Sequence, residues 1–188
     1  CMLLAGVLGV DRVEICLGQQ RGPGAVALPG ATPRLVVAER LARQAPEPEF
    51  RFVVGRALAQ VLTRSLYLAA LPGRKVELVL AAVVELFDRG YGAYLGHGPE
   101  LDDLSRRVSR QVPRRVRKGF EELARAHGAA GTLSVSKWQR AAERSAERVG
   151  LLVAGDVETS LRVLRQAKAS AKQQAELLRF AVGPHLHE

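Results

Sequence analysis

The sequence predicts an α+β fold in which a small N-terminal β-sheet lies on a mostly helical body. Three observations predict this class. Short runs rich in β-branched residues, separated by glycine and proline, fill the first 37 residues. After Pro48, apolar residues recur instead at the three- and four-residue spacing of helices. A chain of 188 residues with 47% hydrophobic and 25% charged residues is also typical of a folded protein with a sizeable core.

The strands are expected near the N-terminus. Residues 1–10 form an apolar run that is too short to span a membrane, and we expect it to pack as a buried strand or short helix. Residues 12–19, with the sequence RVEICLGQ, alternate between polar and apolar side chains as a strand does. Glycine and proline then interrupt the chain and leave room for short strands at 25–28 and 34–37.

Six or seven helices are expected in the rest of the chain, with proline and glycine marking several of their ends. Gly155 and Asp156 are predicted to end one helix and cap the next, and Trp138 is predicted to lie in the core. We expect a single domain over residues 1–182, followed by a loose tail at 183–188. The expected helices are 49–70, 74–88, 100–111, 113–127, 135–154, 157–169 and 171–181.

The composition narrows the class of partner and the compartment. The formal net charge is +9, which favours an acidic partner such as a nucleic acid. Aromatic residues make up only 5%, so little surface is available for stacking single-stranded bases. Cys1 and Cys16 show no metal-ligand spacing and are too few for a disulfide scaffold. We therefore expect a soluble protein of the cytoplasm.

One helix has the outline of a zinc-peptidase active site. In HExxH enzymes two histidines one turn apart bind zinc, and the glutamate beside the first acts as general base. The stretch VVGRALAQVL (53–62) resembles VLAHELAHVL of the HtpX-like and CaaX-protease-like gluzincins, and ERSAERVGLL (143–152) is similar to the later segment that supplies their third ligand. The resemblance implies a zincin-like fold in one domain of a longer bacterial protein, and a chain that does not begin with Met agrees with a longer parent.

The residues at the motif positions depart from the family pattern. Arg56 and Gln60 stand at the two histidine positions and Ala57 at the catalytic glutamate, while Glu143 falls on the third-ligand position and Glu147 replaces an aspartate. Arginine has no lone pair for zinc and alanine cannot take a proton. We therefore predict no bound metal, no cofactor and no peptidase activity.

Two interpretations of Arg56 and Glu143 follow from the resemblance. If the fold is kept, both inherit positions that face one metal ion, and an arginine–carboxylate pair can replace that ion as the tie between the two helices. Alternatively, both are solvated charges on amphipathic helices.

A basic segment provides a separate candidate site. Seven cations lie within thirteen residues, a density that can follow a phosphate backbone. The alternative is a solvated helix face whose valines pack inward and whose charges pair with the acids on either side. The seven are Arg106, Arg107, Arg110, Arg114, Arg115, Arg117 and Lys118.

Together these patterns predict a catalytically inactive peptidase-like domain that acts as a scaffold or binds a protein or peptide partner. The predicted binding place is a groove over the strand at 34–37, where a peptide adds as a further strand. The alternative function is the binding of nucleic acid or another polyanion by residues 106–118. No membrane partner is expected, and the sequence leaves the oligomeric state open.

Overall fold

The structure, a computed structural model, describes residues 1–19, 24–91, 98–130 and 134–183. The side chains of residues 114 and 127–130 are outside this description. The chain divides into two compact units, the first formed by residues 1–70 and 140–188 and the second by 71–139. A single domain over residues 1–182 stays a prediction.

The fold class is confirmed as mostly helical with one small sheet. The three strands are β1 (Glu14–Gly18), β2 (Ala25–Leu28) and β3 (Arg34–Ala38), close to the predicted ranges. Their order is β1-β3-β2, with β1 parallel and β2 antiparallel to the central β3. The described residues also form ten helices, more than the six or seven predicted.

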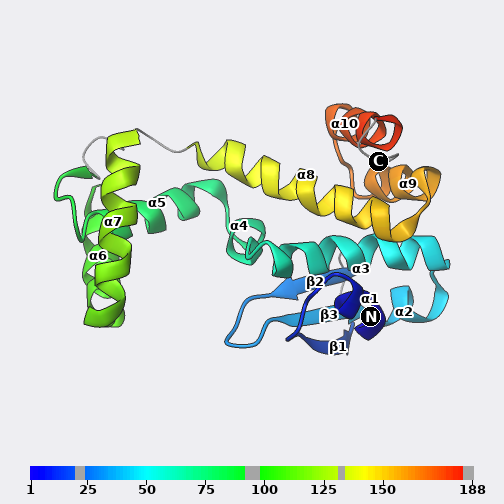
Figure 1. Ribbon diagram of the computed structural model, residues 1–188, viewed down its shortest axis with the longest axis horizontal. Coiled ribbons are helices and arrows are strands. Elements are labelled where there is room, and N and C mark those ends of the chain that lie inside the picture. The colour runs from blue at the N-terminus through cyan, green and yellow to red at the C-terminus, as the bar shows by residue number, and fades with distance from the viewer. Residues whose placement is uncertain (20–23, 92–97, 131–133, 184–188) are drawn as a thin grey trace. The chain divides into compact units, whose positions relative to one another are not determined.

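Helix α3 (Glu47–Leu62) covers one face of this sheet (Figure 1). Phe52 and Leu58 of α3 are fully buried, as is Leu35 of β3, so the core of the first unit lies between the helix and the sheet. Short helices α1 (Met2–Val7) and α2 (Glu39–Gln44) border this layer.

The predicted helix 49–70 is broken in the structure. Helix α3 ends at Leu62, and α4 (Leu66–Ala70) begins after a turn in which Arg64 has a φ of 54°. The Thr63 hydroxyl donates back to Ala59 O, and Ser65 N donates to Gln60 O. These bonds end the helical ladder although no proline or glycine marks the position.

The first unit also contains residues 140–154 of α8 (Val135–Ala154), together with α9 (Val157–Gln166) and α10 (Ala171–Val182). Asp156 caps α9 as predicted, since its carboxylate accepts from Thr159 N at 2.9 Å. Gly155 has a φ of 65°, which glycine adopts at little cost.

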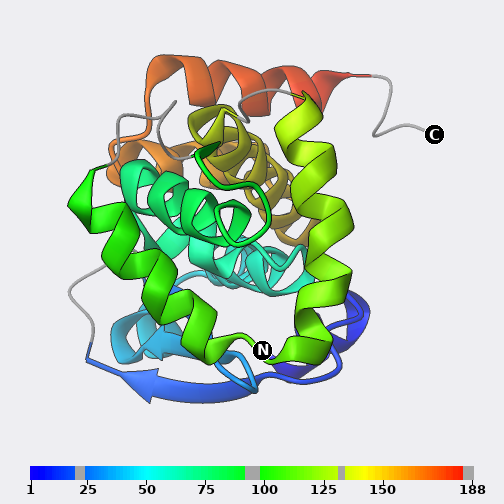
Figure 2. The same ribbon diagram turned by 90° about the vertical axis from the view of Figure 1, so that its left-hand side faces the viewer.

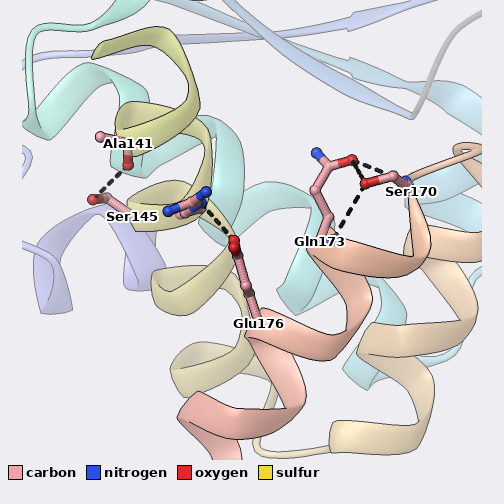
Figure 3. Close-up of polar contacts among 6 residues, drawn as sticks. Ala141, Ser145, Ser170, Gln173 and Glu176 are labelled. Carbon is pink, nitrogen blue, oxygen red and sulfur yellow. Dashed lines mark hydrogen bonds and ion pairs between the residues drawn. The ribbon is translucent and has the colours of Figure 1, made fainter. Parts of the chain in front are cut away.

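Replacing Ser170 with alanine is expected to lower the free energy of unfolding of the first unit by about 1 kcal/mol. Ser170 and Gln173 form a reciprocal capping box at the start of α10, which Figure 3 shows as a ring of hydrogen bonds. The matched control is Ser145→Ala. The Ser145 hydroxyl bonds only to Ala141 O in its own helix, so its loss should be close to neutral. Urea unfolding followed by circular dichroism compares the two variants, and equal effects would contradict the capping role.

The second unit is helical. Helices α6 (Pro99–Gln111) and α7 (Arg114–Ala130) both pack on α5 (Gly73–Val84), as Figure 2 shows. Leu78, Ala81 and Ala82 of α5 form an apolar cluster with Leu101 of α6.

The prediction that Trp138 lies in the core is wrong. Its side chain is exposed, whereas Val135 and Ala146 of the same helix are buried. The buried face of α8 is therefore rotated by about one residue from the face that carries Trp138. None of the helices in the described residues combines the length and the apolar character that crossing a membrane requires.

Candidate functional site

The two helices that carry the motif positions cross at a pair of glycines in the first unit. A Cβ atom added to Gly55 of α3 would lie 3.2 Å from Gly150 Cα of α8. A Cβ atom added to Gly150 would lie 2.7 Å from Arg56 Cγ and 2.8 Å from Phe52 O. The two backbones therefore touch with no room for a methyl group at residue 150, and this contact places Arg56 beside α8.

Arg56 meets a buried carboxylate across this crossing. Its Nη2 lies 3.9 Å from Oε1 of Glu147, whose side chain is only 2% exposed, while the Arg56 side chain is 21% exposed. Neither Arg56 Nε nor Glu147 Oε1 has a hydrogen-bond partner among the described residues. The guanidinium also lies over the ring of Phe52, 5.7 Å from its centroid. The contact between α3 and α8 is thus an ion pair without a direct hydrogen bond.

This partner corrects the pairing proposed from sequence, which joined Arg56 to Glu143. Glu143 is exposed, and it takes part in no ion pair of the described residues. Glu147 lies one helical turn further on, on the face that also carries the buried Ala146 and Ala154. The position of that face, set by the glycine crossing, decides which glutamate reaches α3.

Further charges surround Glu147. Glu176 of α10 points to α8 (Figure 3), where its Oε2 lies 2.5 Å from Arg144 Nε in an ion pair without hydrogen-bond geometry. Burial raises the pKa of Glu147 to about 7; Arg56 and Arg144 counteract this rise, while the carboxylates of Glu143 and Glu176 add to it. Part of the Glu147 population is therefore neutral near pH 7.

The remaining motif positions do not fit a gluzincin zinc ion. Ala57 is buried and offers no proton acceptor, and Gln60, half-buried, offers an amide where the family has imidazole. Arg56 is already opposite Glu147. Within the part of the chain that is described, no three His, Cys, Asp or Glu side chains lie close enough to share a metal ion. Arg56, Ala57 and Gln60, the residues of α3 at the predicted motif positions, therefore lack the imidazole and carboxylate groups of a gluzincin zinc site.

All four histidines of the sequence lie outside the ranges of the two helices that carry the motif positions. Helix α7 includes His127, but its side chain is not described. His97, His185 and His187 are outside the described residues altogether.

The predicted peptide groove over residues 34–37 is also corrected. These residues belong to β3, the central strand, whose two edges pair with β1 and β2. A peptide cannot add to β3 without displacing one of its neighbours. The strand that packs on α3 and ends the sheet is β2, which runs antiparallel to β3.

The structure separates the seven cations of the basic segment into three groups. Arg107 pairs with Asp103, and Arg117 donates to the carbonyl oxygens of Ser109 and Val112. The side chain of Arg114 lies outside the described side chains. The other four are exposed: Arg106, Arg110, Arg115 and Lys118.

Sequence reasoning missed two parts of the site. Gly55 was not selected, although a glycine inside a helix usually marks a place where another backbone approaches closely. The Arg144–Glu176 pair joins residues of α8 and α10 that no short motif connects.

Comparison of the sequence with protein-family models, and of the chain with curated proteins and solved structures, gives no match.

Proposed function

We propose that the first unit is a metal-free counterpart of the gluzincin peptidases that binds a protein or peptide partner without cleaving it. One observation carries the proposal. At the crossing of the two helices that would hold zinc, the structure has the ion pair of Arg56 with the buried Glu147. A donor-only arginine at a ligand position leaves nothing to bind or activate a hydrolytic water.

The edge strand β2 supports peptide binding by strand addition. An edge strand presents unpaired N–H and C=O groups along one side, and an extended peptide can bond to them. Leu28, at the end of β2, is exposed, and we expect its side chain to contact such a peptide. A cytoplasmic location fits this proposal, because Cys1 and Cys16 are both free thiols.

Mixed-sequence decapeptides with a fluorescent label test the proposal by anisotropy and mass spectrometry. Leu28→Lys should weaken binding about three- to fivefold, because a lysine on an edge disfavours a further strand. The matched control is Leu17→Lys on β1, the opposite edge strand, where another exposed leucine is replaced.

The peptides should stay intact, and N-methylation of alternate residues should abolish binding, since strand addition uses main-chain hydrogen bonds. Cleavage of any peptide would contradict the inactive assignment. Equal weakening by the two lysine variants would exclude β2 as the binding edge.

A further inference from the structure

The joint between α6 and α7 in the second unit concentrates positive charge. Residues 104–120 contain all seven cations of the basic segment and no acidic residue. This stretch covers the second half of α6, the turn at Val112 and Pro113, and the first turns of α7. We call it the α6–α7 corner.

The corner is fixed by one of its own arginines. Arg117, in the first turns of α7, donates from Nη2 to Ser109 O and from Nε to Val112 O at 3.3 Å. These carbonyls belong to the C-terminal end of α6, where a cation is favourable. The last turn of α6 and the first turn of α7 are therefore held together, and the other cations project from a defined scaffold.

Among the described side chains, the acids beside the corner form an ion pair with only one of its cations, Arg107. Asp103 pairs with Arg107, and Glu121 pairs with Arg125 at 2.6 Å. Arg110, Arg115 and Lys118 are exposed, and they have no acidic partner among the described residues. These three cations are thus solvated, as the alternative interpretation expects, but they do not form its ion pairs with the neighbouring acids.

The four exposed cations are close enough to contact one stretch of backbone phosphates. At a rise of 1.5 Å per residue, Arg106 lies about 9 Å along α6 from the turn, and Lys118 about 8 Å along α7 on the other side. Over the resulting span of at most about 17 Å, a nucleic-acid duplex carries about ten phosphates. Three of the four are arginines, whose planar head groups match phosphate oxygens in pairs.

We propose that the α6–α7 corner binds the phosphodiester backbone of a nucleic-acid duplex through Arg106, Arg110, Arg115 and Lys118. The contact is independent of base sequence, since these cations meet phosphates rather than base edges. Single strands are the poorer ligand, because Phe120 is the one aromatic residue in the stretch and base stacking needs several.

The test is fluorescence anisotropy of the full chain with a 20-base-pair DNA duplex of mixed sequence between 50 and 300 mM KCl. Four phosphate contacts predict that log K falls against log salt with a slope of about −3 to −4. The triple variant Arg110→Glu, Arg115→Glu, Lys118→Glu should lose more than about thirtyfold in affinity at 100 mM KCl.

The control triple variant makes the same charge change on the first unit, with Arg12→Glu, Arg40→Glu and Lys172→Glu, all at exposed positions. It should weaken binding only a few-fold through the lower net charge. Equal losses in the two triple variants, a salt slope near zero, or no binding at 50 mM KCl would overturn the proposal.

A second experiment measures binding to vesicles with 30% phosphatidylserine. It is needed because α7 also exposes an apolar stripe of Val116, Phe120 and Leu123. Tighter binding to these vesicles than to the duplex would assign the corner to a membrane surface and would likewise overturn the proposal.

Discussion

Replacing Gly150 with alanine is expected to destabilise the first unit by about 2 kcal/mol. The added Cβ would lie 2.8 Å from Phe52 O, a main-chain atom that cannot move unless α3 and α8 separate. It would also lie 2.7 Å from Arg56 Cγ and push the guanidinium away from Glu147. The usual gain of about 1 kcal/mol from alanine over glycine inside a helix is too small to offset this clash.

The control for this experiment is Gly6→Ala in α1, which belongs to the same unit. A Cβ atom at Gly6 has nothing within 4 Å, so this change should be neutral or slightly stabilising. Urea unfolding of both variants gives the comparison. A Gly150→Ala protein at least as stable as the parent would show that the two helices do not touch at this glycine.

The second large expected effect is a dependence of folding stability on pH that arises from the ionisation of Glu147. The pKa of Glu147 is raised to about 7 in the folded protein from 4.5 in the unfolded chain. Between these values the unfolded chain has released the proton while the folded protein still holds it, so the stability falls as the pH rises. The raised pKa of Glu147 contributes about 3 kcal/mol to the free energy of unfolding. This contribution is fully present below pH 4.5 and lost above pH 7.

The variant Glu147→Gln is expected to remove this fall of stability with rising pH. Because glutamine resembles the protonated acid, the variant should match the parent protein near pH 4 and exceed its stability by about 3 kcal/mol near pH 8. The matched control is Glu143→Gln, an exposed carboxylate one turn away whose loss should keep most of the slope. Unfolding free energies at five pH values from 4 to 8 give the result. Parallel pH profiles for the parent and Glu147→Gln would contradict the buried, protonated glutamate.

The ion pair of Arg56 with Glu147 contributes little to the stability of the first unit. A buried pair gains little net stability, because desolvation of both charges offsets their attraction. The glycine contact sets the distance between α3 and α8, and Arg56 with Glu147 occupies the place where the helices face each other. The pair thus follows from the crossing that the glycines set and supplies little of its stability.

Much of the fold follows from local sequence signals. Helix α8 has the predicted bounds, 135–154, because its apolar spacing is regular and Gly155 and Asp156 end it clearly. The strand at 25–28 is likewise confirmed between turn-forming residues. The break at Arg64 was not predictable in the same way, since hydrogen bonds of Thr63 and Ser65 make it rather than proline or glycine.

The errors at the candidate site arise from contacts between distant segments. Spacing along α8 could not distinguish Glu143 from Glu147 as the partner of Arg56, because the choice depends on the rotation of α8 against α3. Strand order could not be predicted either, and it makes β3 central and β2 the edge. Of the two interpretations left open by the sequence, the one with a cation of α3 opposite a carboxylate of α8 describes the kind of contact, but with Glu147 in place of Glu143.

The proposal that an ion pair stands where gluzincins hold zinc is tested most directly by the metal content of the purified, tag-free protein. Elemental mass spectrometry after purification in buffer with 50 μM zinc chloride, followed by desalting, gives the ratio of zinc to protein. We predict less than about one zinc per ten chains, because Arg56, Gln60 and Glu143 cannot form a zinc site. One zinc per chain, removed by chelator with a loss of stability, would contradict the account.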